Sequence, residues 1–428
     1  MEMGRSWDSL SFTTNKDYPM LPTRHQFTVL KQLCDLVPAH LVSKLARAHG
    51  VEGKSRAFTP WSHTVSLMFA QVSHALSLND VCDTLENHGG VLTTIRHAAA
   101  PSRNGLSHAN RERNADMAEA LFWEMLAHLQ GCWPQFGMGR KYVGFPRRFR
   151  KRVIHVVDST TISLVANCMG WAKHRRRKAA AKCHMRLDLN SFLPRFAVVK
   201  GAGSQDAREA RGVCAGILAG EIVVFDKAYV DFAHLQELDE RSVFWVSRAK
   251  TNLQYEVVRE HSPAGGRILR DVVIRLTGNR TATIYAGELR LVTAKVEVDG
   301  RELVLTFMTN NLDWSANSVS DLYKGRWGIE VFFKQIKQTL QLGDFLGYNE
   351  NAVRWQIWTA LLVYVLLRFL AYMGKWGHSF ARLFTLLRGT LWECYDLFAL
   401  LGRYGTAAPP PRCRAAPEQA YLPNLNLC

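Results

Sequence analysis

Two short runs of mostly β-branched residues, each followed by an aspartate, limit the possible folds of this chain more than any other feature. The first run covers residues 153–157 and precedes Asp158, and the second covers residues 221–225 and precedes Asp226. Runs of this composition are typical of buried central strands. A helical pattern over residues 206–217 lies between them. The alternation of strand and helix patterns predicts a mixed α/β sheet.

The regions on either side of this α/β segment have different periodicities. Apolar residues spaced three and four apart predict helices over residues 24–130 and again from about residue 317 onward. Between the α/β segment and the second helical region, four strand-like segments with turn residues predict an antiparallel β-rich insertion. The four segments are residues 272–276, 281–286, 289–298 and 302–307.

The balance of charge favours a polyanionic partner. The 428 residues include 54 lysines and arginines against 37 aspartates and glutamates, a formal net charge of +17. Two stretches, residues 140–152 and 173–186, contain many basic residues and no acidic one. Such stretches are typical of nucleic-acid-binding proteins, although a solvated basic surface or linker has the same composition. Nucleic acid is therefore the partner that we expect.

Cysteine usage and hydropathy indicate the compartment. The nine cysteines contain no Cys-x-x-Cys pair and no metal-binding spacing, which favours a reducing cytosol over a disulfide framework. The first residues lack the apolar core of a signal peptide. The longest apolar run, residues 357–367, is about half the length of a membrane span and predicts a buried helix. We expect a cytoplasmic protein with no membrane contact.

Four polar residues near position 330 share one face of a predicted helix. Tyr323, Arg326, Glu330 and Lys337 fall within about 60° of one another at helical periodicity. For Arg326 and Glu330 alone, a surface ion pair worth tenths of a kcal/mol is an equally good interpretation. That interpretation leaves the shared line of all four residues unexplained, so the face is also a candidate functional site.

The spacing Tyr-x2-Arg-x3-Glu-x6-Lys resembles the signature of the DDE transposases of bacterial insertion sequences, in the branch numbered four. Residues 157–161 resemble the segment of the family's first aspartate. Residues 225–229 resemble that of the second, although Asp-Lys-Ala-Tyr stands where Asp-Arg-Gly-Tyr is more usual. Residues 71–78 and 106–111 are similar to the N-terminal domain of the same branch. The resemblance runs from about residue 24 to 375.

The resemblance implies an RNase H-like catalytic core with a β-rich insertion, an N-terminal helical domain and a helical C-terminus. In that fold the two aspartate strands are neighbours, and a helix brings the glutamate to them. The expected division is a tail over 1–23, a DNA-binding helical domain over 24–135, the first part of the core over 150–251, the insertion over 252–312, the core helix over 313–345, a helical region over 346–406 and a disordered tail over 407–428.

The resemblance also implies the chemistry. Asp158, Asp226 and Glu330 are the expected catalytic residues and metal ligands, holding Mg2+ with Mn2+ able to substitute, because hard cations prefer carboxylate oxygens. The expected DNA contacts are Tyr323, Arg326, Lys337, Arg248, Lys250, Lys182 and His184. For the last four, a solvated basic face is an equally good interpretation. Some members stack a flipped base on a tryptophan of the insertion; this insertion has none, so Tyr255 or Tyr285 is the candidate.

The expected function is metal-dependent cleavage of duplex DNA at the terminal inverted repeats of an element, followed by strand transfer into target DNA, by cut and paste. A homodimer is expected in the synaptic complex, in a cytoplasmic, nucleoid-associated protein. Two alternatives remain open at the level of sequence. One is a nuclease of the same fold that cuts without joining, and the other is an inactive DNA-binding protein descended from a transposase.

Overall fold

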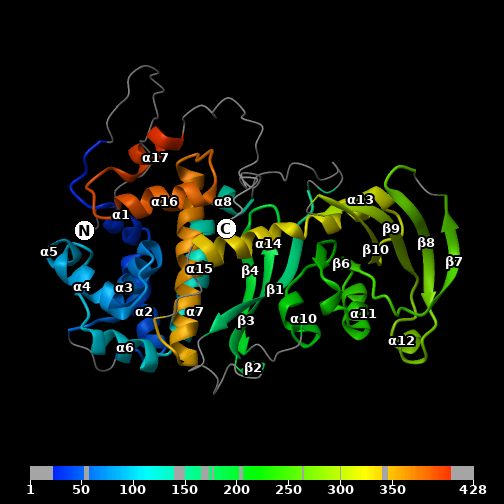
Figure 1. The fold of residues 1–428 in the computed structure, drawn as a ribbon, viewed down its shortest axis with the longest axis horizontal. Helices are drawn as coiled ribbons and strands as arrows, with labels where there is room; N and C mark the ends of the chain where they lie inside the picture. Colours follow the sequence, from blue (N-terminus) through cyan, green and yellow to red (C-terminus); the bar gives the residue numbers. More distant parts are fainter. Residues whose placement is uncertain are drawn as a thin grey trace, which may run out of the picture.

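The computed structural model describes residues 23–52, 57–138, 149, 151–164, 173–175, 178–201, 206–262, 265–298, 300–339 and 346–405. Its main feature is a ten-stranded sheet in the order β2-β3-β1-β5-β6-β10-β9-β8-β7, with β4 paired to β3. In Figure 1 the helices of the N- and C-terminal regions lie on the left, and the sheet extends to the right. Outside the described residues lie the predicted tail over 407–428 and all but the last residue of the predicted tail over 1–23. Most of the basic stretch 140–152 also lies outside them.

The two β-branched runs form adjacent central strands, as predicted. Strand β1 pairs in parallel with β5, and β5 pairs in parallel with β6, whereas β3 pairs antiparallel with both β1 and β4. Val157 is opposite Phe225 in the β1–β5 register, so Asp158 and Asp226 follow at equivalent positions. The strands are β1 (Ile154–Leu164), β2 (Lys173–Arg175), β3 (Lys178–Asp188), β4 (Leu193–Gly201), β5 (Ile222–Phe225) and β6 (Phe244–Arg248).

The two faces of this sheet contact different apolar cores. Ile154 and Val156 belong to the large core shared with the terminal helices, whereas Val157 belongs to a smaller core. The smaller core includes α10 (Asp206–Cys214) and α11 (Phe232–Glu240). Because successive side chains of a strand point to opposite faces, Asp158 lies on the face of the large core and Ser159 on the other.

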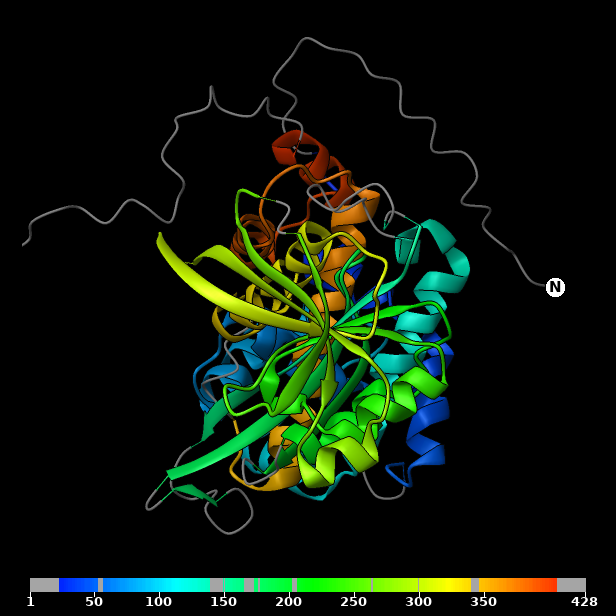
Figure 2. The same ribbon diagram turned by 90° about the vertical axis from the view of Figure 1, so that its right-hand side faces the viewer.

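The β-rich insertion continues the same sheet. Strand β10 (Arg301–Thr309) pairs with β6, and β9 (Leu289–Val298), β8 (Ile268–Leu276) and β7 (Tyr255–His261) follow outward. Seen from the right-hand side of Figure 1, the strands fan out through the strong twist that such sheets adopt (Figure 2). The ten strands therefore form one continuous sheet.

One predicted strand of the insertion is wrong. Residues 281–286 were expected to be extended, but α12 (Asn279–Ile284) is a helix. Strands β8 and β9 pair directly with each other, so the segment between them has no place in the ladder. The hydroxyl of Thr283 donates to the carbonyl of Asn279 one turn earlier (3.1 Å), a bond that lets this β-branched residue stay in a helix.

The N-terminal region is helical, and side-chain caps begin several of its helices. Thr28, Thr59, Ser77 and Ser102 each accept a hydrogen bond from a backbone amide of the first turn. The helices are α1 (Val29–Asp35), α2 (Ala39–Ala48), α3 (Pro60–Ser73), α4 (Leu78–Asn87), α5 (Gly89–Thr93), α6 (Arg103–Glu112), α7 (Asp116–Cys132) and α8 (Pro134–Met138).

The long helix α15 (Glu350–Met373) contains the apolar run and packs against α3 and α7. It is long and apolar enough to cross a membrane, but 78% of its most apolar window is buried inside the protein. The prediction of a buried core helix is therefore confirmed. Helices α16 (Phe380–Thr390) and α17 (Leu397–Gly405) follow it.

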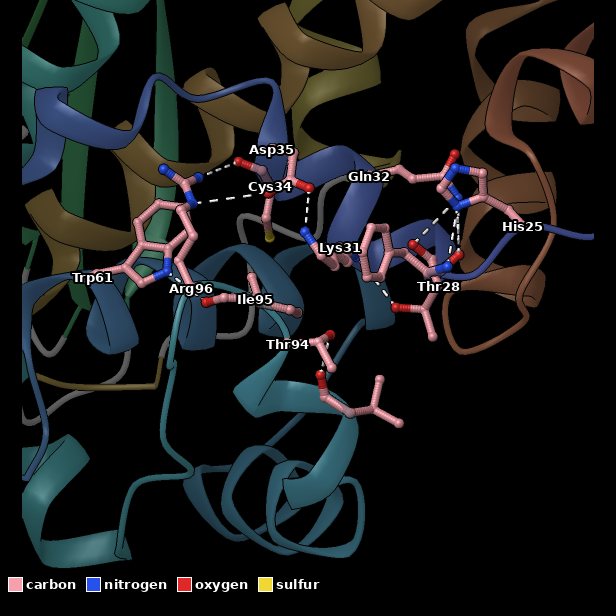
Figure 3. Close-up of polar contacts among 12 residues, drawn as sticks. His25, Thr28, Lys31, Gln32, Cys34, Asp35, Trp61, Thr94, Ile95 and Arg96 are labelled. Atoms are coloured by element: carbon pink, nitrogen blue, oxygen red, sulfur yellow. Dashed lines mark hydrogen bonds and ion pairs between the residues drawn. The ribbon is translucent and has the colours of Figure 1, made fainter. Parts of the chain in front are cut away.

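The first described segment is bound to the last. The amide of His25 donates to the carbonyl of Cys394 (2.8 Å), and the side chain of Gln32 bonds the backbone of Tyr395 (2.7 Å). On the other side of α1, the guanidinium of Arg96 lies 3.7 Å from the ring centre of Trp61 and donates to the carbonyl of Cys34 (Figure 3). Helix α1 is thereby fixed to both terminal regions.

Candidate active site

The two aspartates lie at equivalent positions on the neighbouring central strands β1 and β5. Asp158 continues from β1 as part of the strand, and Asp226 follows the last residue of β5. Their negative charges interact, since the charge of Asp226 helps to raise the pKa of Asp158. The sequence prediction that these two residues come together is consistent with this geometry.

The predicted single helix over residues 323–337 is interrupted. Helix α13 (Ala316–Lys324) ends before Gly325, α14 (Trp327–Lys334) begins after Arg326, and a π-helical turn covers Gln335–Thr339. The amides around the junction bond carbonyls three residues earlier, which tightens the turn. Four residues at helical spacing therefore share a site without sharing one regular helix.

Helix α14 is held close to the sheet by Gly328. A Cβ at this position would lie 2.7 Å from Cδ1 of Leu189, the residue after the end of β3. A larger residue would therefore require the Leu189 side chain to shift. Glu330 follows two residues later on the same helix, which packs against β1.

Arg326 links the helix to the sheet. Its Nη1 donates to Oδ2 of Asp158 (2.7 Å), and its Nη2 donates to Oε1 of Glu330 (2.6 Å). Only 12% of its side chain is exposed, against 46% for Glu330. The i,i+4 pair expected of a surface helix exists, but its arginine is mostly buried and also binds a carboxylate of the sheet.

The neighbouring residue of the stripe binds the other aspartate. The hydroxyl of Tyr323 donates to Oδ1 of Asp226 (3.2 Å), and the side chain of Tyr323 is buried. Lys337 donates from Nζ to the carbonyl of Thr161 (2.7 Å) on β1. Tyr323 and Arg326 thus contact the two aspartates directly. Glu330 is linked to Asp158 through Arg326, and Lys337 contacts β1 three residues beyond Asp158.

The pKa of Asp158 is affected by its burial and by the charged groups around it. Burial raises the pKa of Asp158 to about 6; the charge of Arg326 and the Ser159 amide oppose this rise, and the charges of Asp226 and Glu330 add to it. Three carboxylates therefore influence one another in a partly desolvated space. Such a space is suited to cations, whether a guanidinium or a metal ion.

The fit to a metal ion depends on the type and arrangement of donors. Asp158, Asp226 and Glu330 offer carboxylate oxygens, which hard divalent cations prefer. Among the described residues, no three acidic, histidine or cysteine side chains already form a metal-binding cluster. A positive group does occupy the space between two of these carboxylates, namely the guanidinium of Arg326. The donor chemistry fits, and Arg326 is the group with which an arriving cation would compete.

Two of the other expected DNA contacts lie near the ends of β5 and β6. Arg248 is the last residue of β6, and its charge acts on Tyr323. Lys250 donates from Nζ to the carbonyl of Val230 (3.0 Å), four residues after Asp226. Both remain near the candidate site.

The remaining two predicted contacts lie away from the carboxylates of the candidate site. Lys182 and His184 lie on the opposite face of the sheet, where Lys182 donates to Oδ2 of Asp206 (2.8 Å). His184 is fully buried, with Nδ1 3.0 Å from the hydroxyl of Tyr229, so the expected contact with a DNA phosphate is wrong. Sequence reasoning also missed Asp206, because an acidic residue at the start of a helix is ordinary.

The two candidates for base stacking, Tyr255 and Tyr285, differ in their burial. Tyr285 is 1% exposed, and its hydroxyl donates to the carboxylate of Asp239. A ring buried in this way has no face for a base, which contradicts its candidacy. Tyr255, the first residue of β7, is only partly buried and remains a candidate.

Two family models match this chain. Residues 149–366 match the model of a transposase DDE domain, and residues 25–95 match a domain of unknown function (DUF4372). A protein of Sinorhizobium fredii named as transposase y4zB is 32% identical over 284 residues, which is 64% of this chain and 76% of the relative.

A protein of Geobacillus stearothermophilus, named as a transposase for insertion sequence element IS5377, is 29% identical over 234 residues. The match covers 54% of this chain and 59% of that relative. A solved structure of the piggyBac transposase synaptic complex with hairpin DNA aligns with a TM-score of 0.43 and 10% identity, over 92% of this chain and 85% of its own.

Proposed function

Because this chain belongs to the DDE transposases of bacterial insertion sequences, enzymes that cut DNA and transfer its strands, we propose that it moves its element by cut and paste, with Asp158, Asp226 and Glu330 as its catalytic residues. The observation that carries the proposal is the position of Arg326, bonded to Asp158 and Glu330 at once. The bond from Tyr323 to Asp226 supports it, because it connects the third carboxylate to the same segment.

We also propose that the sheet contains an RNase H-like core. The order β4-β3-β1-β5-β6 and the mixture of parallel and antiparallel pairs support this assignment. The core would comprise residues 150–251 and 313–345, and the insertion would comprise 252–312. The helical residues 24–135 would bind DNA, and those over 346–406 would complete the large apolar core.

Members of this family generally use divalent metal ions, and we propose Mg2+, with Mn2+ able to substitute. Such ions would activate the attacking oxygen and stabilise the departing one. Asp158, Asp226 and Glu330 would hold them. Burial of Asp158 limits the water around it, which strengthens its interaction with any cation.

The basic residues of the stripe would bind the DNA backbone. Arg326 can exchange its carboxylates for a phosphate, for which its planar fork is equally suited. Lys337 would act as a point charge on a neighbouring phosphate, and Arg248 and Lys250 would extend this surface. Tyr323 would keep Asp226 oriented while Arg326 is engaged.

The DNA would be the terminal inverted repeats of the element and then the target. We propose a homodimer in the synaptic complex, because two ends must be cut in concert and symmetric association is the common solution. The protein would work in the cytoplasm, associated with the nucleoid.

A joining assay tests the proposed function. Pre-cut, labelled element ends are incubated with a target plasmid, Mg2+ and the protein. The expected result is covalent transfer of the ends into the plasmid. Cleavage of intact ends without any transfer of pre-cut ends would instead identify a nuclease, and the absence of both reactions beside normal DNA binding would identify an inactive DNA-binding protein.

A further inference from the structure

A second polar network lies directly behind Asp158, on the opposite face of the sheet. Its centre is Asp206, the first residue of α10. Oδ1 of Asp206 accepts from the hydroxyl of Ser159 (2.7 Å), and Oδ2 accepts from Nζ of Lys182 (2.8 Å). Nδ1 of His184 lies 3.4 Å from Asp206 as well. These contacts lie on the face of the sheet opposite to Asp158 and Arg326.

The network reaches Asp158 through Ser159. The amide of Ser159 donates to Oδ1 of Asp158 (2.8 Å), while its hydroxyl is held by Asp206. One residue is therefore bonded to a carboxylate on each face of β1. A rotation of the Asp158 side chain, or a shift of the strand at Ser159, would disturb both bonds.

The network also reaches the second aspartate strand. Nδ1 of His184 lies 3.0 Å from the hydroxyl of Tyr229, which ends the short 3-10 helix Lys227–Tyr229. That helix begins directly after Asp226. Strands β1 and β3 and the residues after β5 are thus bonded to one another behind the two aspartates.

Burial and charge suit this network to a fixed geometry. The side chains of Lys182 and Asp206 are 15% and 17% exposed, and His184 and Tyr229 are buried. Asp206 pairs with the ammonium of Lys182, so its charge is balanced locally. Breaking such a buried network by removing one partner leaves the others unsatisfied, which disfavours alternative arrangements.

We propose that Asp206 is a positioning residue of the active centre, which fixes Ser159 and, through Ser159, the orientation of the Asp158 carboxylate. The inference rests on the proposed function, in which Asp158 holds a metal ion. Asp206 would touch neither metal nor DNA. Its loss should therefore weaken metal binding and slow the chemical step without weakening the binding of DNA.

The test is Asp206→Asn, which keeps the size of the side chain and removes its charge. Calorimetric titration of the DNA-free protein with Mn2+ should show at least a tenfold loss of affinity. Cleavage of a labelled element end should need correspondingly more metal and have at least a tenfold lower kcat, with the KM for DNA unchanged. The matched control is Glu209→Gln on the same helix, where Glu209 bonds Lys200 (2.8 Å), and it should behave as wild type.

A smaller change tests the link even if Asp206→Asn folds poorly. Ser159→Ala removes only the hydroxyl that Asp206 holds, and it should lower Mn2+ affinity in the same direction. The double variant should be no worse than the more affected single variant, because both changes interrupt one path.

The inference is overturned if Asp206→Asn, or Ser159→Ala where the former does not fold, binds Mn2+ as tightly as Glu209→Gln, or if the two losses add in full. Asp158→Asn is measured in parallel. If Asp158→Asn cuts normally, the proposed function itself has failed. If Asp158→Asn is inactive while Asp206→Asn matches wild type, only the role of Asp206 is rejected.

Discussion

Nη1 of Arg326 lies 2.7 Å from Oδ2 of Asp158, although 168 residues separate the two along the chain. This bond connects the middle of central strand β1 to the start of α14, which follows the whole β-rich insertion. Arg326 also bonds Glu330, and the charge of Asp226 acts on Asp158. The two aspartates and the later glutamate therefore interact electrostatically.

Glu330→Gln should abolish catalysis and leave DNA binding intact. The change keeps the helix face and nearly the same volume but removes a charged metal ligand, so nicking and joining should fall by about three orders of magnitude or more. Asp158→Asn and Asp226→Asn should match it without adding to it. Cleavage of a labelled element end is measured beside a gel-shift assay, with Glu124→Gln, which loses an exposed pair with Lys44, as control. Near wild-type cutting by Glu330→Gln would reduce Glu330 to a surface partner of Arg326.

Arg326→Gln should increase the affinity of the DNA-free protein for divalent metal. Without the guanidinium, the carboxylates of Asp158 and Glu330 lose their cation, and a gain of about tenfold, or about 1.4 kcal/mol, is expected. Calorimetric titration with Mn2+ measures this gain. Arg354→Gln is the matched control, because Arg354 on α15 also bonds two carboxylates, Asp116 (2.7 Å) and Glu119 (3.2 Å), both on α7. Equal affinities in all three proteins would show that Arg326 does not compete with metal.

Duplex DNA binding should weaken steeply with salt. A protein that neutralises several phosphates releases their counterions, so the affinity should fall roughly a thousandfold between about 50 and 200 mM monovalent salt. Fluorescence anisotropy of a labelled duplex at several salt concentrations gives the slope of log K against log salt. A nearly flat plot would mean that the net charge of +17 does not serve DNA binding.

Stability should decrease in mild acid through His63, a buried residue of α3. Burial lowers the pKa of His63 to about 3; the charge of Arg113 lowers it further, and the hydrogen bond to Asn110 opposes the shift. The unfolded chain binds the proton near pH 6.5 and the folded protein only near pH 3. The neutral ring's contribution is therefore complete above pH 6.5 and lost as the pH falls, by about 2 kcal/mol at pH 5.

Denaturant unfolding at several pH values checks this dependence. His63→Gln can still donate a hydrogen bond to Asn110. It should reduce the loss of unfolding free energy between pH 7 and pH 5 by about 2 kcal/mol. Replacement of the exposed His40 by glutamine should leave the profile unchanged. A His63→Gln profile parallel to wild type would assign the acid sensitivity to other groups.

The two tyrosines of the insertion should separate in function. Tyr255→Ala should slow hairpin formation at the element end by the loss of roughly 1–3 kcal/mol of stacking, while the first nick is unaffected. Tyr285→Phe should instead lower the free energy of unfolding by about 1 kcal/mol, because the partly buried carboxylate of Asp239 loses a donor. Hairpin yield on a denaturing gel and urea unfolding measure the two effects. Equal hairpin rates in wild type and Tyr255→Ala would leave the stacking role to another residue.

The central strands and the apolar core helix could be predicted because their patterns are local. A β-branched run such as 153–157, or the apolar run over 357–367, has the same meaning wherever the partner segments lie. The pairing of β1 with β5 was different, since it came only from the resemblance to a family. No spacing between Asp158 and Asp226 requires their strands to be neighbours.

Other features could not be read from the sequence for physical reasons. Alternation along β3 shows that Lys182 and His184 share a face, but the face is chosen by what packs on each side of the sheet. The role of Asp206 depends on that choice. The close approach of Gly328 to Leu189 is a contact between segments far apart in sequence, which no local pattern predicts.

The continuity of the sheet limits how the insertion can move relative to the core. Strand β10 is hydrogen-bonded to β6 at three paired positions, Phe307 with Arg248, Met308 with Ser247 and Thr309 with Val246. A swing of the insertion as a hinged flap would have to break this seam. A rotation of the outer strands would therefore be transmitted as sheet twist toward β5 and β1, the strands beside the two aspartates.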